Sequence, residues 1–162
     1  MNNKLAGSIK IEGLVQGVGF RPYIYKIALN NEIKGTVDNR TDGVYIHAEG
    51  TKESIGNFLN DIYKKKPKPA LIKNITFNKA QLENHSKFSI IKSEDNTDQI
   101  TLISPDIAVC DDCLNDLKQQ DHRINYPFIN CTNCGPRFTI IRDLPYDRAK
   151  TTMDEFPMCS RC

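Results

Sequence analysis

Six cysteines constrain this chain more than any other feature, because they form three Cys-x-x-Cys pairs confined to its last third. Two thiolates separated by two residues can bind one Zn²⁺ ion, and two such pairs complete a tetrahedral four-sulfur site. The first two pairs are separated by 17 residues, which matches the spacing of a complete site. The third pair has no partner in the sequence, so we expect one complete site, one incomplete site and a chain that is part of a larger protein. The pairs are Cys110/Cys113, Cys131/Cys134 and Cys159/Cys162.

Two pairings of these cysteines fit the spacing. Sequential pairing, which we favour, places the first pair and the second pair around one zinc ion. A crossed arrangement instead joins the second pair to the third. Four-sulfur sites leave no open position for a substrate, so the zinc is predicted to be structural. His47, His85 and His122 are predicted to be surface residues, because none has ligand spacing to a second histidine.

The charge is divided unevenly along the chain. Residues 1–93 carry 15 Lys and Arg against 8 Asp and Glu, whereas residues 94–162 carry 7 against 12. The half with the cysteines is therefore acidic, and this argues against a nucleic-acid-binding finger, which needs Lys and Arg to neutralise phosphates. The basic half suits a small anionic substrate better.

Hydropathy predicts no contact with a membrane. No apolar run approaches the roughly 18 residues of a membrane span, and the polar start of the sequence is unlike a signal peptide. We therefore expect a cytoplasmic protein, and a reducing compartment favours zinc binding over disulfides for paired cysteines.

The apolar pattern of residues 1–92 predicts five strands and two helices. A helix begins near Pro22, whose fixed φ suits a first turn, and buries Ile24, Ile27 and Ala28. The second helix covers Ser54–Tyr63. The predicted strands are Leu5–Val15, Gly35–Asn39, Val44–Ala48, Ile75–Phe77 and Phe88–Ile91.

The order of these elements indicates an α+β fold. It corresponds to a ferredoxin-like β-α-β-β-α-β sandwich, with two helices on one face of an antiparallel sheet. We expect this domain at residues 1–92, a polar linker at 93–105 and a small zinc-stabilised C4-type finger region at 106–162.

A glycine-rich loop, which we call the cradle, joins the first strand to the first helix. Its glycines let successive backbone N–H groups converge, and the following helix adds the positive end of its dipole. Arg21 adds a guanidinium that can grip a phosphate at two points. The loop lacks the Gly-Lys-Ser/Thr of a nucleotide P-loop. Its residues are Gln16, Gly17, Val18, Gly19, Phe20 and Arg21.

A second motif, from Gly35 through Asn39 to an Asp42-Gly43 turn, follows the cradle. With these two motifs the chain resembles the acylphosphatase family over about residues 4–92. The resemblance implies that Arg21 and the backbone of Gln16 to Phe20 bind a phosphoryl group, and that Asn39 orients a water for in-line attack. Asp42 is interpreted as a turn residue rather than a general base.

The cysteine region carries more sequence than a zinc site needs. The segments Asn130–Ile140, Leu144–Arg148 and Thr151–Met153 resemble the carbamoyltransferase family that matures NiFe-hydrogenases. That resemblance implies cleavage of carbamoyl phosphate, or another acyl phosphate, at the first domain. ATP-dependent activation and transfer to a cysteine of a maturation partner protein would require domains that follow Cys162 in that family, so we expect no complete transfer by these residues alone.

Three functions therefore compete. The first is an acylphosphatase-type hydrolase tethered to a zinc module. The second is a non-catalytic zinc-binding adaptor whose first domain binds an anion. The third and weakest is a nucleic-acid-binding zinc protein, which the acidic cysteine region argues against.

Overall fold

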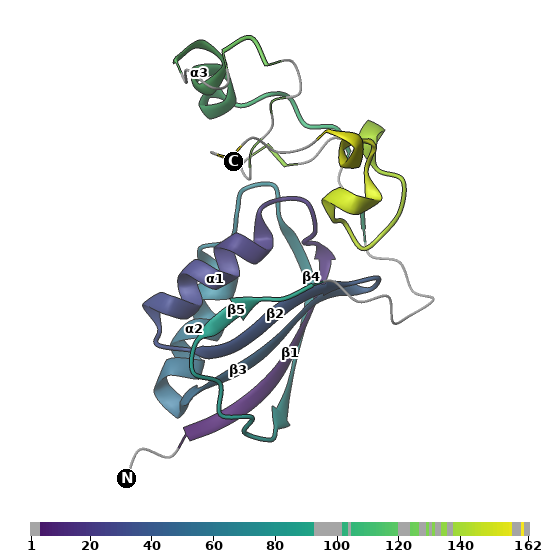
Figure 1. Cartoon of the computed structure of the whole chain (residues 1–162). Helices are drawn as coiled ribbons and strands as arrows, with labels where there is room; N and C mark the ends of the chain where they lie inside the picture. Colours follow the sequence, from purple (N-terminus) through teal and green to yellow (C-terminus); the bar gives the residue numbers. More distant parts are fainter. Residues whose placement is uncertain are drawn as a thin grey trace.

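The computed structural model describes residues 4–92, 102–103, 105–119, 124–126, 129, 131, 134–135, 138–156 and 160. Residues 4–92 form one five-stranded sheet in the order β4-β1-β3-β2-β5 with two helices against it, here called the sandwich. Figure 1 shows α1 and α2 on the same face of the sheet. The elements are β1 (Lys4–Leu14), α1 (Phe20–Asn30), β2 (Lys34–Arg40), β3 (Gly43–Thr51), α2 (Lys52–Lys64), β4 (Leu71–Ala80) and β5 (Phe88–Ile90).

Alternating side chains of the central strands build the core. Ile9 of β1 lies opposite Ile46 of β3, and both point toward the helices with almost no exposed surface. From the helices, Ile24 and Phe58 are fully buried in the same cluster. Burying a large apolar side chain contributes about 1.5–3 kcal/mol relative to leaving it exposed, so this face holds the sandwich together.

The two helices of the sandwich begin slightly earlier than the sequence predicts, at Phe20 and Lys52. α2 is capped by Thr51, whose Oγ1 accepts a hydrogen bond from the Ser54 N–H at 3.0 Å. α1 begins directly after Gly19, and Pro22 lies in its first turn. The described helices include none with the length and apolar character needed to cross a membrane.

The expectation of a purely antiparallel sheet is wrong at one edge. β5 pairs with β2 in parallel, with Gly35 opposite Phe88 and Val37 opposite Ile90. β4 lies at the other edge of the sheet, so the connection of residues 81–87 crosses the sheet to reach β5. A crossing of this kind depends on long-range pairing, which local apolar periodicity does not encode.

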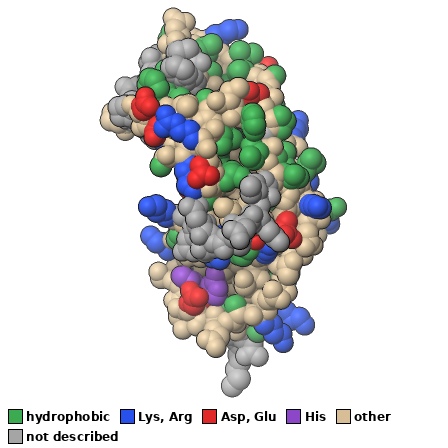
Figure 2. Space-filling model, turned by 90° about the vertical axis from the view of Figure 1, so that its right-hand side faces the viewer, with side chains coloured by type: hydrophobic (Ala, Val, Ile, Leu, Met, Phe, Trp, Pro, Cys, Tyr) green, Lys and Arg blue, Asp and Glu red, His purple; other side chains and the backbone are tan. Residues whose placement is uncertain are grey.

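Glu49 at the end of β3 fixes this connection. Its carboxylate is 4% exposed and accepts hydrogen bonds from the backbone N–H groups of Glu83, Asn84 and His85. Burial alone would raise the pKa of the Glu49 carboxyl, but these donors and His47 outweigh it, so the pKa lies below its usual range. On this part of the surface, histidine side chains lie beside a carboxylate (Figure 2).

The described residues from 105 onward, here called the finger, lie beyond one end of the sheet (Figure 1). The sequence analysis missed α3 (Asp111–Gln119), a short helix with two acidic residues in its first turn and Lys118 in its last. These charges complement the helix dipole, whereas apolar periodicity is weak here. Three 3-10 turns follow: η1 (Phe138–Ile140), η2 (Arg148–Lys150) and η3 (Thr152–Glu155). Cys159, Cys162, His122 and most of the predicted 93–105 linker lie outside the described residues.

Candidate functional site

The cradle is a left-handed turn between β1 and α1. Gly17 and Gly19 have φ angles of 72° and 71°, a region that favours glycine because it has no Cβ. Val15 and Val18 are fully buried and anchor the loop in the core. The first turn of α1 carries no acidic residue, so its positive end remains available to an anion.

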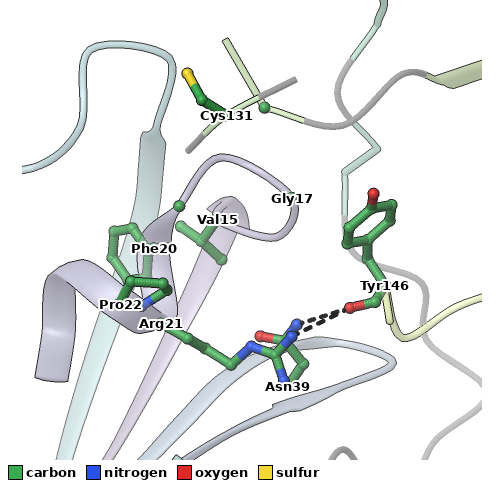
Figure 3. A pocket seen from close by; sticks show the side chains of 10 residues that line it. Val15, Gly17, Phe20, Arg21, Pro22, Asn39, Cys131 and Tyr146 are labelled. Carbon is green, nitrogen blue, oxygen red and sulfur yellow. Dashed lines mark hydrogen bonds between the residues drawn. The ribbon is translucent and has the colours of Figure 1, made fainter. Parts of the chain in front are cut away.

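Arg21 and Asn39 converge on the same point, although 17 residues separate them in the sequence. Arg21 Nη2 and Asn39 Nδ2 both donate to the carbonyl oxygen of Tyr146, at 3.4 and 3.3 Å (Figure 3). Both line a pocket of about 340 Å³, whose sandwich side is formed by the cradle. The finger closes the other side with Cys131, Gly135 and Tyr146.

The side-chain oxygen of Asn39 is a buried acceptor. Asn39 is 2% exposed, and within the described part of the chain nothing donates a hydrogen bond to its Oδ1. Leaving such a group unpaired costs about 1–3 kcal/mol. A water in the pocket would remove that cost by donating to Oδ1, and its lone pairs would then be oriented by the contact.

Gln16 has a role that sequence reasoning missed. The cradle prediction uses only its backbone, but its side chain is 4% exposed and joins three segments. Gln16 Nε2 donates to the carbonyl oxygens of Arg40 and Gly43, and its Oε1 accepts from the Tyr146 N–H at 3.0 Å. The side chain thus ties the cradle to the β2–β3 turn and to the finger.

Tyr146 and Asp147 are further site residues that sequence reasoning did not assign. Asp147 Oδ1 accepts from Arg21 Nη2 at 2.7 Å, so a finger carboxylate contacts the guanidinium predicted to hold phosphate. A signal was available, because the Leu144–Arg148 segment lies outside the first two cysteine pairs and yet resembles the carbamoyltransferase family. Only the tertiary contact gives that segment its place in the pocket.

Asp42 lies between β2 and β3, as expected of a turn residue, and its carboxylate is held by two neighbouring side chains. Lys10 Nζ lies 2.7 Å from Asp42 Oδ2, and the Tyr45 hydroxyl donates to the same oxygen at 2.9 Å. Burial raises the pKa of Asp42, but Lys10 and Tyr45 together lower it by more, so the pKa lies below its usual range. A carboxylate held in this way is a poor proton acceptor near neutral pH.

Four cysteines meet in the finger. The Sγ atoms of Cys110 and Cys131 are 3.4 Å apart, those of Cys113 and Cys134 are 3.7 Å apart, and those of Cys131 and Cys134 are 3.9 Å apart. Zn–S bonds of about 2.3 Å in a tetrahedron give sulfur separations of about 3.8 Å, so the cluster fits such an ion. The structure thus brings together the two pairs that sequential pairing groups.

The surroundings of this cluster favour a cation. Burial raises the pKa of the Cys113 thiol, and the sulfur atoms of Cys131 and Cys134 raise it further. A bound divalent cation would stabilise the thiolates by neutralising charges held this close together. The cluster can therefore bind a metal ion, with no position left open for a substrate.

Gly135 connects the cysteine cluster to the cradle. Its N–H donates to the Cys131 carbonyl at 2.8 Å, and its φ of 69° again favours glycine. A Cβ at this position would lie 2.5 Å from the carbonyl oxygen of Gly17. The sequence analysis did not predict this contact between the two regions.

Family models match the sandwich and the finger separately. The acylphosphatase family model matches residues 7–90. The chain belongs to the acylphosphatase family. A second model, the HypF finger, matches residues 109–141, the region that contains the cysteine cluster.

Relatives extend the match beyond the acylphosphatase domain. A probable carbamoyltransferase HypF from Methanocaldococcus jannaschii is 49% identical over 148 residues, which are 90% of this chain and 19% of that protein. Full-length HypF in a phosphate- and nucleotide-bound crystal form has a TM-score of 0.94 and 45% identity, covering 100% of this chain and 22% of that one. An acylphosphatase from Thermotoga maritima is 40% identical over 83 residues, covering 51% of this chain and 91% of the relative. The chain thus spans about a fifth of the HypF relatives, and its resemblance to the hydrogenase maturation carbamoyltransferases is confirmed.

Proposed function

We propose that the cradle hydrolyses acyl phosphates, with carbamoyl phosphate as the preferred substrate. The observation that carries this proposal is the buried, unpaired Asn39 Oδ1 in the same pocket as Arg21. Arg21 and the N–H groups of Gln16 to Phe20 would bind the phosphoryl oxygens and offset the charge that develops on them. The relatives named carbamoyltransferase favour the carbamoyl substrate.

The reaction needs positioning more than proton transfer. A water that donates to Asn39 Oδ1 presents a lone pair to phosphorus, and attack breaks the bond between phosphorus and the acyl oxygen. Carbamate leaves with the bond electrons as a stable anion, so no protonated side chain is required. The attacking water passes its proton to a phosphoryl oxygen, which completes the inorganic phosphate.

The finger would act as a scaffold for this pocket. Zn²⁺ held by Cys110, Cys113, Cys131 and Cys134 would fix the segment that carries Gly135, and so one wall of the pocket. Cys159 and Cys162 would contribute to a second site. Activation of carbamate with ATP, and its transfer to a hydrogenase maturation partner, would belong to a longer protein of the HypF type in the cytoplasm.

Phosphate release from carbamoyl phosphate tests the proposal. The unaltered chain should release phosphate faster than spontaneous decay, and both Arg21→Ala and Asn39→Ala should lose this excess, by about 100-fold or more. Arg142→Ala is a matched control, because Arg142 is exposed and pairs with Asp154 away from the cradle. Retained hydrolysis in Arg21→Ala would contradict the assignment.

A non-catalytic adaptor is the second candidate, and the Arg21–Asp147 pair favours it. A carboxylate on the phosphate-binding guanidinium could keep the cradle idle while the finger binds a partner. Stoichiometric metal together with no turnover on any acyl phosphate would support this function. Turnover that depends on Asn39 would exclude it.

A further inference from the structure

Two histidines and a glutamate meet on the open face of the sheet, away from the cradle and the cysteines. His47 lies on β3, whereas Glu83 and His85 lie on the connection between β4 and β5. The two imidazole rings are 5.4 Å apart, and the ligand atoms of the three residues lie within 4.8 Å of one another. The sequence analysis assigned these histidines to the surface from their spacing, and it did not predict that the fold brings this pair together.

The arrangement orients the nitrogens of His47. Its Nε2 lies 3.1 Å from Glu49 Oε1, and a carboxylate there accepts the Nε2 proton. Nδ1 is then the ring nitrogen that faces Glu83, whose Oε1 lies 3.9 Å away. A carboxylate behind a histidine in this way fixes the tautomer and ring orientation that metal-binding histidines need.

The connection holds the other two ligands in place. Three successive backbone N–H groups, at residues 83–85, donate to the buried Glu49 carboxylate at 2.6–3.0 Å. His85 Nε2 already lies 3.0 Å from Glu83 Oε2. The Glu83 side chain is 61% exposed, which leaves it room to move toward an ion.

We propose that His47, Glu83 and His85 form a binding site for a divalent cation of borderline softness, such as Zn²⁺ or Co²⁺. Two imidazole nitrogens and one carboxylate oxygen suit such ions, and a water would complete the tetrahedron. Bonds of about 2.0–2.1 Å place tetrahedral ligands about 3.3 Å apart, a value between the 3.0 and 3.9 Å observed here. The cation would also offset the negative charge of two carboxylates, Glu49 and Glu83, that lie beside the two histidines.

This site has different ligand atoms from the cysteine cluster, so the absorption spectrum of bound Co²⁺ distinguishes the two sites. Thiolates bound to Co²⁺ give an intense charge-transfer absorption, whereas imidazole and carboxylate ligands do not. The experiment therefore loads the full chain with one equivalent of Zn²⁺, which the four-cysteine cluster binds, then titrates in Co²⁺ and follows its binding by calorimetry and absorption. We expect one additional Co²⁺ per chain without the thiolate absorption.

Four variants test which residues hold the ion. His47→Ala and His85→Ala should each weaken Co²⁺ binding by about 100-fold or more, and Glu83→Gln by about 10-fold or more. His122→Ala is the matched control and should leave the affinity unchanged. Thermal unfolding of each variant without Co²⁺ confirms that it is folded, and Glu83→Gln and His85→Ala change partly exposed side chains that the core does not use.

Glu49 is a positioning residue in this proposal. Glu49→Gln should weaken Co²⁺ binding by about 10- to 100-fold while phosphate release at the cradle is retained. A folded chain that binds no additional Co²⁺ would overturn the proposal. Binding that is accompanied by thiolate absorption and by nothing else, or binding without that absorption that survives in His85→Ala, would overturn it equally.

Discussion

The sandwich and the finger reach a compact structure by different means. Eighteen buried residues between Ile9 and Phe88 form one continuous apolar cluster in the sandwich. In the finger the most deeply buried apolar side chains are two cysteines, Cys113 and Cys134, at 0% and 1% exposure. The sandwich is therefore stabilised by apolar burial, whereas we expect the finger to depend on a metal ion held by its cysteine cluster.

The candidate site lies where these two regions meet, and it uses both. Arg21 and Asn39 come from elements fixed by the apolar core, whereas Tyr146 and Asp147 come from the finger. One wall of the pocket is therefore formed by the apolar sandwich and the other by the segment that carries the cysteine cluster.

Metal removal should produce the largest loss of structure, and this loss should be confined to the finger. Metal binding to four thiolates contributes on the order of 10 kcal/mol to folding, so a chelator or Cys113→Ser should unfold the finger. We expect amide hydrogen exchange to become fast in residues 105–156 and to stay slow in β1 and β3. Equal loss of protection in both regions would contradict the separation.

A substitution in the apolar core should instead destabilise the sandwich and leave the finger unchanged. Phe58 is fully buried between α2 and the sheet, so Phe58→Ala should lower the free energy of unfolding of the sandwich by about 3–5 kcal/mol. Tyr63→Ala, on the same helix but 65% exposed, should change it by less than about 0.5 kcal/mol. Urea unfolding measures both. Metal content should be the same in both variants, and a loss of metal in folded Phe58→Ala would show that the regions are not independent.

A smaller effect is expected at the contact between the regions. Gly135→Ala places a Cβ against the Gly17 carbonyl and forces a non-glycine residue to a positive φ, at a cost of about 1–3 kcal/mol. The expected result is a lower thermal midpoint of the finger and shifted amide resonances in the cradle. Gly56→Ala is the control, since nothing lies within 4 Å of its added Cβ and alanine favours a helix. Unchanged cradle resonances in Gly135→Ala would argue against the contact.

The smallest effect should come from Asp147. A phosphoryl group and the Asp147 carboxylate compete for the same guanidinium, so Asp147→Asn should bind inorganic phosphate more tightly. The gain should be about fivefold, or about 1 kcal/mol, because the carboxylate is one-third exposed and water screens the pair. Calorimetric titration with phosphate measures it, beside Asp154→Asn, whose carboxylate pairs with Arg142 instead. Weaker binding in Asp147→Asn would mean that the carboxylate helps to place Arg21.

Local patterns in the sequence determined much of this protein. Alternation predicted the strand before the cradle, Gly17 and Gly19 predicted its turn, and the cysteine spacing predicted the cluster that the structure forms. These features depend on backbone preferences and on short spacings. Such properties are fixed within a few residues and therefore appear directly in the sequence.

Tertiary structure alone decided the contacts between distant segments. It placed β5 parallel to β2, brought Tyr146 and Asp147 to Arg21, and set His47 beside His85. Each contact depends on how the chain crosses the sheet or on how the finger docks at its end. The physical reason is that such contacts follow from the packing of the whole fold, and no local pattern of residues encodes which distant side chains will meet.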